Sequence, residues 1–191
     1  MLYNIATCAE GTICKNNFHT IEILVGKCYD HAFSAFLLIS HGFYDSSDVH
    51  VRSLAEMNNL LLLFLLKPEI YKEYYKTKPE EFSTKYASSK IRKILKKHIK
   101  EKGLGIDLPI DNIAYRNLSS YIHTEWKIPN KYSSCERGRI GGIYQQAGFK
   151  NKIQILLEHA TYTIIFAIKL TNRTDLKHKF ERIFIKEQEC K

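Results

Sequence analysis

The sequence lacks the features of secreted, metal-binding and membrane proteins. Its five cysteines form an odd set without a CxxC pair, and its eight histidines include no HExxH motif. These absences predict free thiols in a reducing compartment, no metal ion and no cofactor. The first residues lack the basic start and apolar core of a signal peptide, and the longest wholly apolar run, 60–66, is too short for a bilayer. We therefore predict a cytoplasmic protein without membrane association.

Strand alternation, internal repeats and phosphate-binding P-loops are missing as well, whereas helical segments have recognisable ends. Gly42 and Gly103 are expected to stop helices, and Pro68 to end one. Ser46, Ser47 or Asp48 are expected to cap one helix start, and Asp107 or Asp111 is expected to cap the helix that carries Arg116 and His123. The predicted helices cover residues 17–41, 48–66, 68–75, 79–102, 111–127, 151–170 and 172–186.

This pattern predicts an all-α protein, an up-and-down helical bundle of five to six main helices. The whole chain, 1–191, would form one domain, with a short flexible N-terminal segment, 1–16. The segments 48–66, 111–127 and 151–170 are expected to supply most of the core, and 127–148 is the least regular part.

Positive charge is in excess, because 29 Lys and Arg stand against 20 Asp and Glu, for a net charge of +9. This balance favours a polyanionic partner such as RNA. The segment 90–102, KIRKILKKHIKEK, places isoleucines and a leucine on an inner face and all seven cations outside. Lys93, Lys96 and Lys97 then lie either on an ordinary solvated face or on a surface that contacts an RNA backbone. Arg137 and Arg139, in the loop CERGRIGG, either close over a substrate or simply connect two helices.

The segment 116–123, RNLSSYIH, carries the strongest chemical signal. Three Arg residues precede a His by five to seven positions, but only Arg116 and His123, seven apart, lie on the same face of a helix. A permanently charged guanidinium beside an imidazole that titrates near neutrality suits a phosphodiester substrate. The spacing is equally typical of an ordinary polar stripe on a surface helix.

A helical wheel of residues 110–127 separates a polar arc from an apolar one. The polar arc holds Asn112, Arg116, Ser119, Ser120, His123 and Lys127. Ile113, Ala114 and Leu118 belong to the apolar arc, and Asn117 falls among them.

Arg116, Asn117 and His123 together resemble the signature of the HEPN (higher eukaryotes and prokaryotes nucleotide-binding) superfamily. In that family an Arg, a small polar residue and a later His occupy a late helix of an all-α bundle. The resemblance implies a metal-independent endoribonuclease in which a 2′-hydroxyl attacks the adjacent phosphorus. His123 would then transfer protons, and Arg116 would stabilise the charge on the phosphorane. Asn117, Ser119 and Ser120 would position the phosphate or the imidazole.

The same resemblance implies a homodimer with a composite site, since one Arg and one His are few groups for both proton transfers. It also implies a toxin or abortive-infection role, with an antitoxin or other regulatory protein as partner. The competing interpretation is a non-catalytic interaction or RNA-binding module that uses the same polar face.

Arg52, Glu56 and Asn59 form a polar stripe in the otherwise apolar segment 48–66. A structural ion pair between Arg52 and Glu56 is one account of this stripe. In the other account, Arg52 or Glu56 orients the face that carries Arg116 and His123. Either way, the resemblance implies that the stripe and the His-bearing helix are neighbours.

Overall fold

A computed structural model describes residues 2–6, 18–119, 142–173, 176–178 and 180–181. Within these ranges the chain is all-α and has no strand, so the predicted fold class is confirmed. The labelled helices are α1 (Leu2–Ala6), α2 (Phe18–Ser40), α3 (Tyr44–Leu66), α4 (Pro68–Tyr74), α5 (Pro79–Lys85), α6 (Ser88–Lys102), α7 (Asn112–Ser119) and α8 (Gln146–Thr171).

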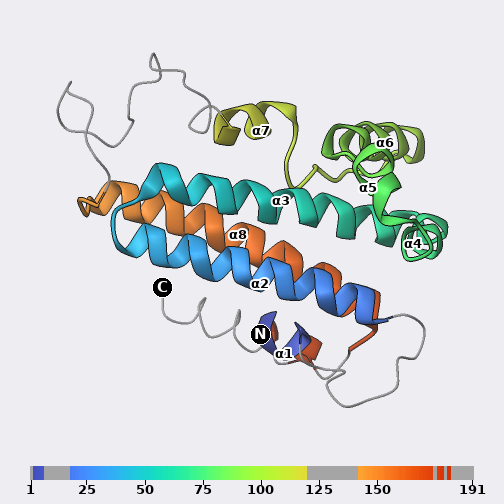
Figure 1. Cartoon of the computed structure of the whole chain (residues 1–191), viewed down its shortest axis with the longest axis horizontal. Helices are drawn as coiled ribbons and strands as arrows, with labels where there is room; N and C mark the ends of the chain where they lie inside the picture. The colour runs from blue at the N-terminus through green and yellow to red at the C-terminus, as the bar shows by residue number, and fades with distance from the viewer. Residues whose placement is uncertain (1, 7–17, 120–141, 174–175, 179, 182–191) are drawn as a thin grey trace.

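Three long helices, α2, α3 and α8, lie side by side and form the body of the molecule (Figure 1). The chain reverses at Gly42, so α3 runs antiparallel to α2. Contacts between Asp48 and Lys152, and between Asn58 and His159, show that α8 runs parallel to α3. The core is therefore not the simple up-and-down order that the sequence predicts, because the segment between α3 and α8 returns the chain to its starting end.

The core is built mainly from α2 and α3, with α8 closing it. Fully buried side chains include Ile21 and Val25 of α2 and Leu61 and Phe64 of α3. Among the described residues of the predicted helix 111–127, only Ser119 is buried, so the expectation that this helix supplies much of the core is wrong for its described part. Residues 2–6, which the sequence placed before the first helix, form α1, and Leu2 joins the core.

Several helix ends follow the predicted signals. Leu66 ends α3 and Pro68 begins α4, while Gly103 ends α6 in the left-handed conformation with φ of 60°. The start of α3 differs from the prediction: it begins at Tyr44 without a side-chain cap, and Asp48 turns inward to Lys152.

The predicted helix 79–102 is divided into α5 and α6. Ala87 leaves helical geometry with φ of −53° and ψ of 135°, and this break lies next to the ring of Tyr86. That ring packs at centroid distances of 4.8 Å from Tyr74 and 5.8 Å from Phe82. The aromatic packing fixes the corner between the two helices.

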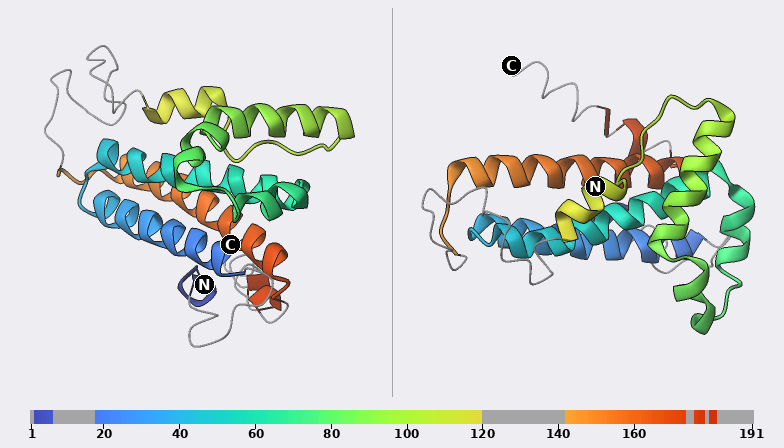
Figure 2. Two further views of the ribbon diagram at one scale, coloured as in Figure 1. Left: turned by 45° about the vertical axis from the view of Figure 1, so that its right-hand side comes forward. Right: turned by 90° about the horizontal axis from the view of Figure 1, so that it is seen from above.

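Helices α6 and α7 pack on α3, on the side away from α2 (Figures 1 and 2). They carry most of the predicted functional residues that the structure describes. By length and composition alone, α2, α3 and α8 are long and apolar enough to cross a membrane. The absence of membrane association therefore stays a prediction.

Candidate nucleic-acid interface

Helix α7 carries Arg116 and has a well-defined start. Asp111, one of the two predicted caps, accepts hydrogen bonds at Oδ1 from the backbone N–H groups of Ile113 (2.9 Å) and Ala114 (2.8 Å). The carboxylate satisfies two of the free donors of the first turn and complements the positive end of the helix dipole. Asp111 therefore fixes where α7 begins and which way its side chains point.

Arg116 lies in the last turn of α7 and is exposed. Among the described residues its guanidinium makes no hydrogen bond or ion pair. Asn117 is exposed beside it. His123, its predicted catalytic partner, lies outside the described residues, as do Ser120, Lys127, Arg137 and Arg139.

The orientation of α7 differs from the predicted wheel. Ile113 is 70% exposed and Ala114 is exposed, although both belong to the predicted apolar arc. Ser119, placed in the polar arc, is only 6% exposed and donates a hydrogen bond to the backbone oxygen of Tyr115 at 2.7 Å. The inner side of α7 therefore includes the polar side chain of Ser119 together with half-buried Tyr115 and Leu118, because part of the surface it meets on α3 is itself polar.

That surface is the predicted stripe of α3. Arg52 donates from Nη1 to Ser119 Oγ at 3.3 Å, so the stripe does lie beside α7. Asn59 exchanges hydrogen bonds with the backbone of Ile110, at 2.9 Å and 3.4 Å, and holds the residues that precede α7. Within the described part of the chain, Arg52 forms no ion pair with Glu56, so the predicted structural pair is not found. Glu56 is half-buried on the same helix.

The position of Arg92 differs from the prediction. The pattern of segment 90–102 predicts seven outward cations, but Arg92 is only 5% exposed. Its Nε donates to Asn112 Oδ1 at 2.9 Å and its Nη1 to Ser88 Oγ at 2.7 Å. Its position next to buried Ile91 was the available signal, since a residue at the border of an apolar face can turn inward.

The predicted RNA-binding lysines of α6, Lys93, Lys96 and Lys97, are all exposed. Lys97 Nζ lies 3.7 Å from Glu101 Oε1. Because solvent screens this exposed ion pair, it contributes little to stability. Lys96 follows Arg92 by one helical turn, and Arg116 follows Asn112 by one turn. The Cβ atoms of Lys96 and Arg116 therefore lie about 5–6 Å from those of Arg92 and Asn112, respectively, which are joined by a hydrogen bond. This places Arg116 and the lysines of α6 on neighbouring helices.

Other titratable groups lie away from this surface. Burial raises the pKa of Cys28 to about 12, which makes its thiol a poor nucleophile. Burial also lowers the pKa of His159, whose Nδ1 has no hydrogen-bond partner in the described structure. His31 and His50 approach at 3.1 Å between their Nδ1 atoms. No group of three or more His, Cys, Asp or Glu that could hold a metal ion occurs among the described residues.

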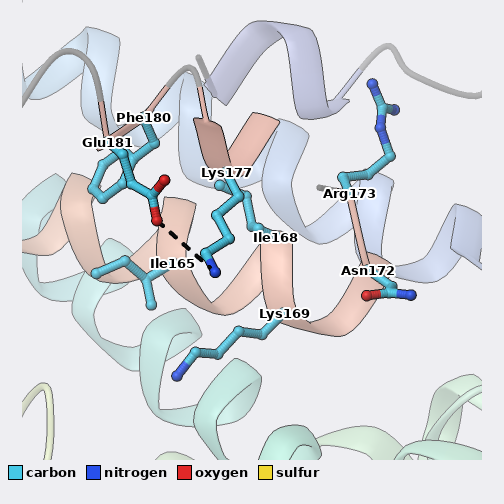
Figure 3. Close-up of a pocket in the computed structure, with 8 residues that line it drawn as sticks. All are labelled: Ile165, Ile168, Lys169, Asn172, Arg173, Lys177, Phe180 and Glu181. Atoms are coloured by element: carbon cyan, nitrogen blue, oxygen red, sulfur yellow. Dashed lines mark ion pairs between the residues drawn. The ribbon is translucent and has the colours of Figure 1, made fainter. Parts of the chain in front are cut away.

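A cavity of about 320 Å³ lies at the C-terminal end of α8 (Figure 3). Ile165, Ile168 and Phe180 contribute apolar side chains to its lining, and Lys169 and Lys177 line it as well. Lys177 points toward Glu181, with 3.9 Å between Nζ and Oε1. Cations at this position complement the negative end of the helix dipole, so their presence does not by itself indicate an anion site.

No family model, curated protein or solved structure matches the chain. The likeness to the HEPN superfamily therefore depends on Arg116, Asn117 and His123 and on the all-α fold.

Proposed function

We propose that the chain is a metal-independent endoribonuclease of the HEPN type, with Arg116 and His123 as its catalytic residues. The observation that carries this proposal is the state of Arg116. It is exposed and has no acidic partner among the described residues. It lies on a helix whose start is capped by Asp111 and whose last described residue, Ser119, accepts a hydrogen bond from Arg52. A guanidinium held in this way is suited to a phosphate group.

The surroundings of Arg116 favour a polyanion as substrate. Helix α6 carries seven Lys and Arg and one acidic residue, and its three predicted contact lysines are exposed. Cations on neighbouring helices can contact successive phosphates of one strand. An RNA strand that crosses α6 and α7 would thus be held by its backbone, largely without sequence preference.

In the proposed reaction the 2′-hydroxyl oxygen attacks the adjacent phosphorus, and the bond from phosphorus to the 5′-oxygen breaks. The products are a 2′,3′-cyclic phosphate and a 5′-hydroxyl end. His123 acts as general base or acid, and Arg116 neutralises the charge of the phosphorane. A second copy of the chain would supply the second imidazole, so the proposed active form is a homodimer of twice 22.3 kDa. The proposal includes an antitoxin-like regulatory protein as a partner, and only the resemblance to the HEPN superfamily supports that partner.

The second candidate function is RNA binding without turnover. The exposed lysines of α6 favour it, because they support binding whether or not an imidazole lies within reach of the scissile phosphate. The two functions differ in one measurable respect, which is whether the RNA is cut.

The test is a gel assay of RNA cleavage with Arg116→Ala and His123→Ala. Loss of a catalytic proton-transfer group typically lowers the rate about 10²- to 10⁴-fold. Arg173→Ala and His178→Ala are matched controls, because these two residues have a similar spacing in the sequence but both follow the C-terminal end of α8. Cleavage that persists in Arg116→Ala and His123→Ala would refute the site. Cleavage should also survive EDTA, and light scattering should report a dimer.

A further inference from the structure

Two guanidinium groups contact the ring of Tyr115. The Cζ atom of Arg92, from α6, lies 4.2 Å from the ring centroid, and that of Arg52, from α3, lies 5.5 Å away. Both distances are within the range of a cation–π interaction. Since Tyr115 belongs to α7, one aromatic ring links three helices.

The same two arginines hold α7 at its opposite ends. Arg92 donates to Asn112, the first residue of the helix, and Arg52 donates to Ser119, its last described residue. A helix of eight residues has little stability of its own in water. Its position is therefore set by these contacts together with the Asp111 cap.

Within the described structure, neither of the two arginines that contact Tyr115 forms an ion pair with a carboxylate. Arg92 is 5% exposed and meets the neutral side chains of Asn112 and Ser88 and the ring of Tyr115, while Arg52 has a buried Nε without a hydrogen-bond partner. Lys152 of α8, by contrast, is a buried cation that is paired with a carboxylate, that of Asp48. A buried guanidinium without a counterion costs stability, so the presence of one against the helix that carries Arg116 calls for a functional account.

We propose that Arg92 is a positioning residue for Arg116. It fixes α7 against α6 through Asn112 and Tyr115, so that Arg116 and Lys96 contact the same RNA strand. This inference rests on the proposed function, specifically on RNA binding at this face. Arg92 itself is too buried to reach a phosphate, and it acts through the geometry of α7 and not as one more surface charge.

The Arg92→Lys variant tests whether Arg92 acts through its directed contacts or only through its positive charge. The ammonium keeps the positive charge but cannot reproduce the two directed hydrogen bonds and the flat contact with Tyr115. Binding of a fluorescein-labelled 2′-O-methyl oligouridine, which lacks the attacking hydroxyl and is therefore not cut, is measured by anisotropy over a range of salt concentrations. Loss of one phosphate contact lowers the magnitude of the salt slope by about 0.7. Arg116→Ala and Arg92→Lys should each show this decrease, and the double variant should show no further decrease.

Lys150→Ala serves as the control for coupling, since Lys150 is an exposed cation on α8. Its effect on affinity should multiply with that of Arg92→Lys, as independent sites do. If the effects of Arg92→Lys and Arg116→Ala also multiply, the positioning role is refuted while RNA binding stands. If the wild type does not bind RNA, or binds it without a contribution from Arg116, the proposed function fails and the positioning role fails with it.

Hydrogen exchange gives a readout that does not require RNA. Arg92→Lys should speed exchange of the α7 amides while leaving those of α2 and α8 protected, and Lys90→Met, an exposed change on α6, should leave α7 unchanged. Unaltered protection of α7 in Arg92→Lys would show that Arg92 does not set the position of that helix. A uniform loss of protection would assign Arg92 to general stability instead.

Discussion

The buried ion pair between Asp48 and Lys152 gives the sharpest test of how the bundle is held together. Lys152 Nζ lies 2.5 Å and 2.6 Å from the two carboxylate oxygens, and the side chains are 5% and 1% exposed. Lys152→Met would leave a buried carboxylate without its counterion. Breaking such a pair typically lowers the free energy of unfolding by about 3–5 kcal/mol. For a chain of this length, that corresponds to a decrease in Tm of roughly 6–20 °C.

The loss should depend on pH in a defined direction. Burial raises the pKa of Asp48 from 3.8 to about 6, and Lys152 opposes that rise. Without the ammonium, the pKa of Asp48 rises further. Because the folded state then holds a proton that the unfolded state releases, stability increases as the pH falls through the folded pKa toward 3.8. The deficit of Lys152→Met should therefore be largest near pH 8 and smaller at pH 5.

The measurement is urea unfolding followed by far-UV circular dichroism at both pH values. Lys150→Met is the matched control, because it removes an exposed lysine two residues away and should change stability by less than about 0.5 kcal/mol. Asp48→Asn combined with Lys152→Met should recover at least half of the loss. A deficit at pH 8 no larger than that of the control, or equal at pH 5 and pH 8, would refute the reasoning.

Two further variants test local features of the same bundle. Gly42 has φ of +78°, and a Cβ there would lie 2.5 Å from the backbone C and O atoms of Ile143, so Gly42→Ala should lower the unfolding free energy by at least about 2 kcal/mol. Gly105→Ala, which meets open space, should be nearly neutral, and equal effects would contradict this account. Burial and His50 lower the pKa of His31, so the stability that its neutral form contributes is present above 6.5 and is lost as the pH falls through the folded pKa. His31→Gln should flatten the acid side of the stability profile relative to wild type, whereas His178→Gln, in a side chain that is 73% exposed, should leave it unchanged.

Long helices that end at a proline or a glycine were predictable from the local sequence. Pro68 cannot lie in the interior of a helix, and Gly103 adopts a left-handed φ at little cost. The local sequence therefore predicts where α3 and α6 end. The start of α3 was not predictable in this way. Asp48 is a good capping residue by type, but it binds Lys152, which lies 104 positions away in the sequence. A long-range ion pair has no signal in the local pattern.

In the candidate site, too, some features were predictable from the local sequence and others were not. Asp111 caps α7 as its sequence position predicts, and the polar stripe of Arg52 lies beside α7 as expected. The wheel nevertheless assigned Ser119 to solvent, because hydrophobic periodicity assumes that a helix packs through its apolar side. That assumption fails where the neighbouring surface is polar, since a buried hydroxyl that accepts from a guanidinium is stabilised there more than a methyl group would be.

Arg92 marks the limit of pattern-based prediction most clearly. Seven cations in a thirteen-residue segment all favour solvent when each is considered alone, and the neighbouring Ile91 is only a weak signal for the one that turns inward. What distinguishes Arg92 is the set of groups that α7 presents to it, namely the oxygen of Asn112 and the ring of Tyr115. These groups lie at least twenty residues further along the chain, and only the fold brings them together. The burial of Arg92 among neutral partners thus results from the tertiary structure. Because Arg92 lies one turn from the exposed Lys96 and bonds to the helix that carries Arg116, it connects the basic face of α6 to that helix.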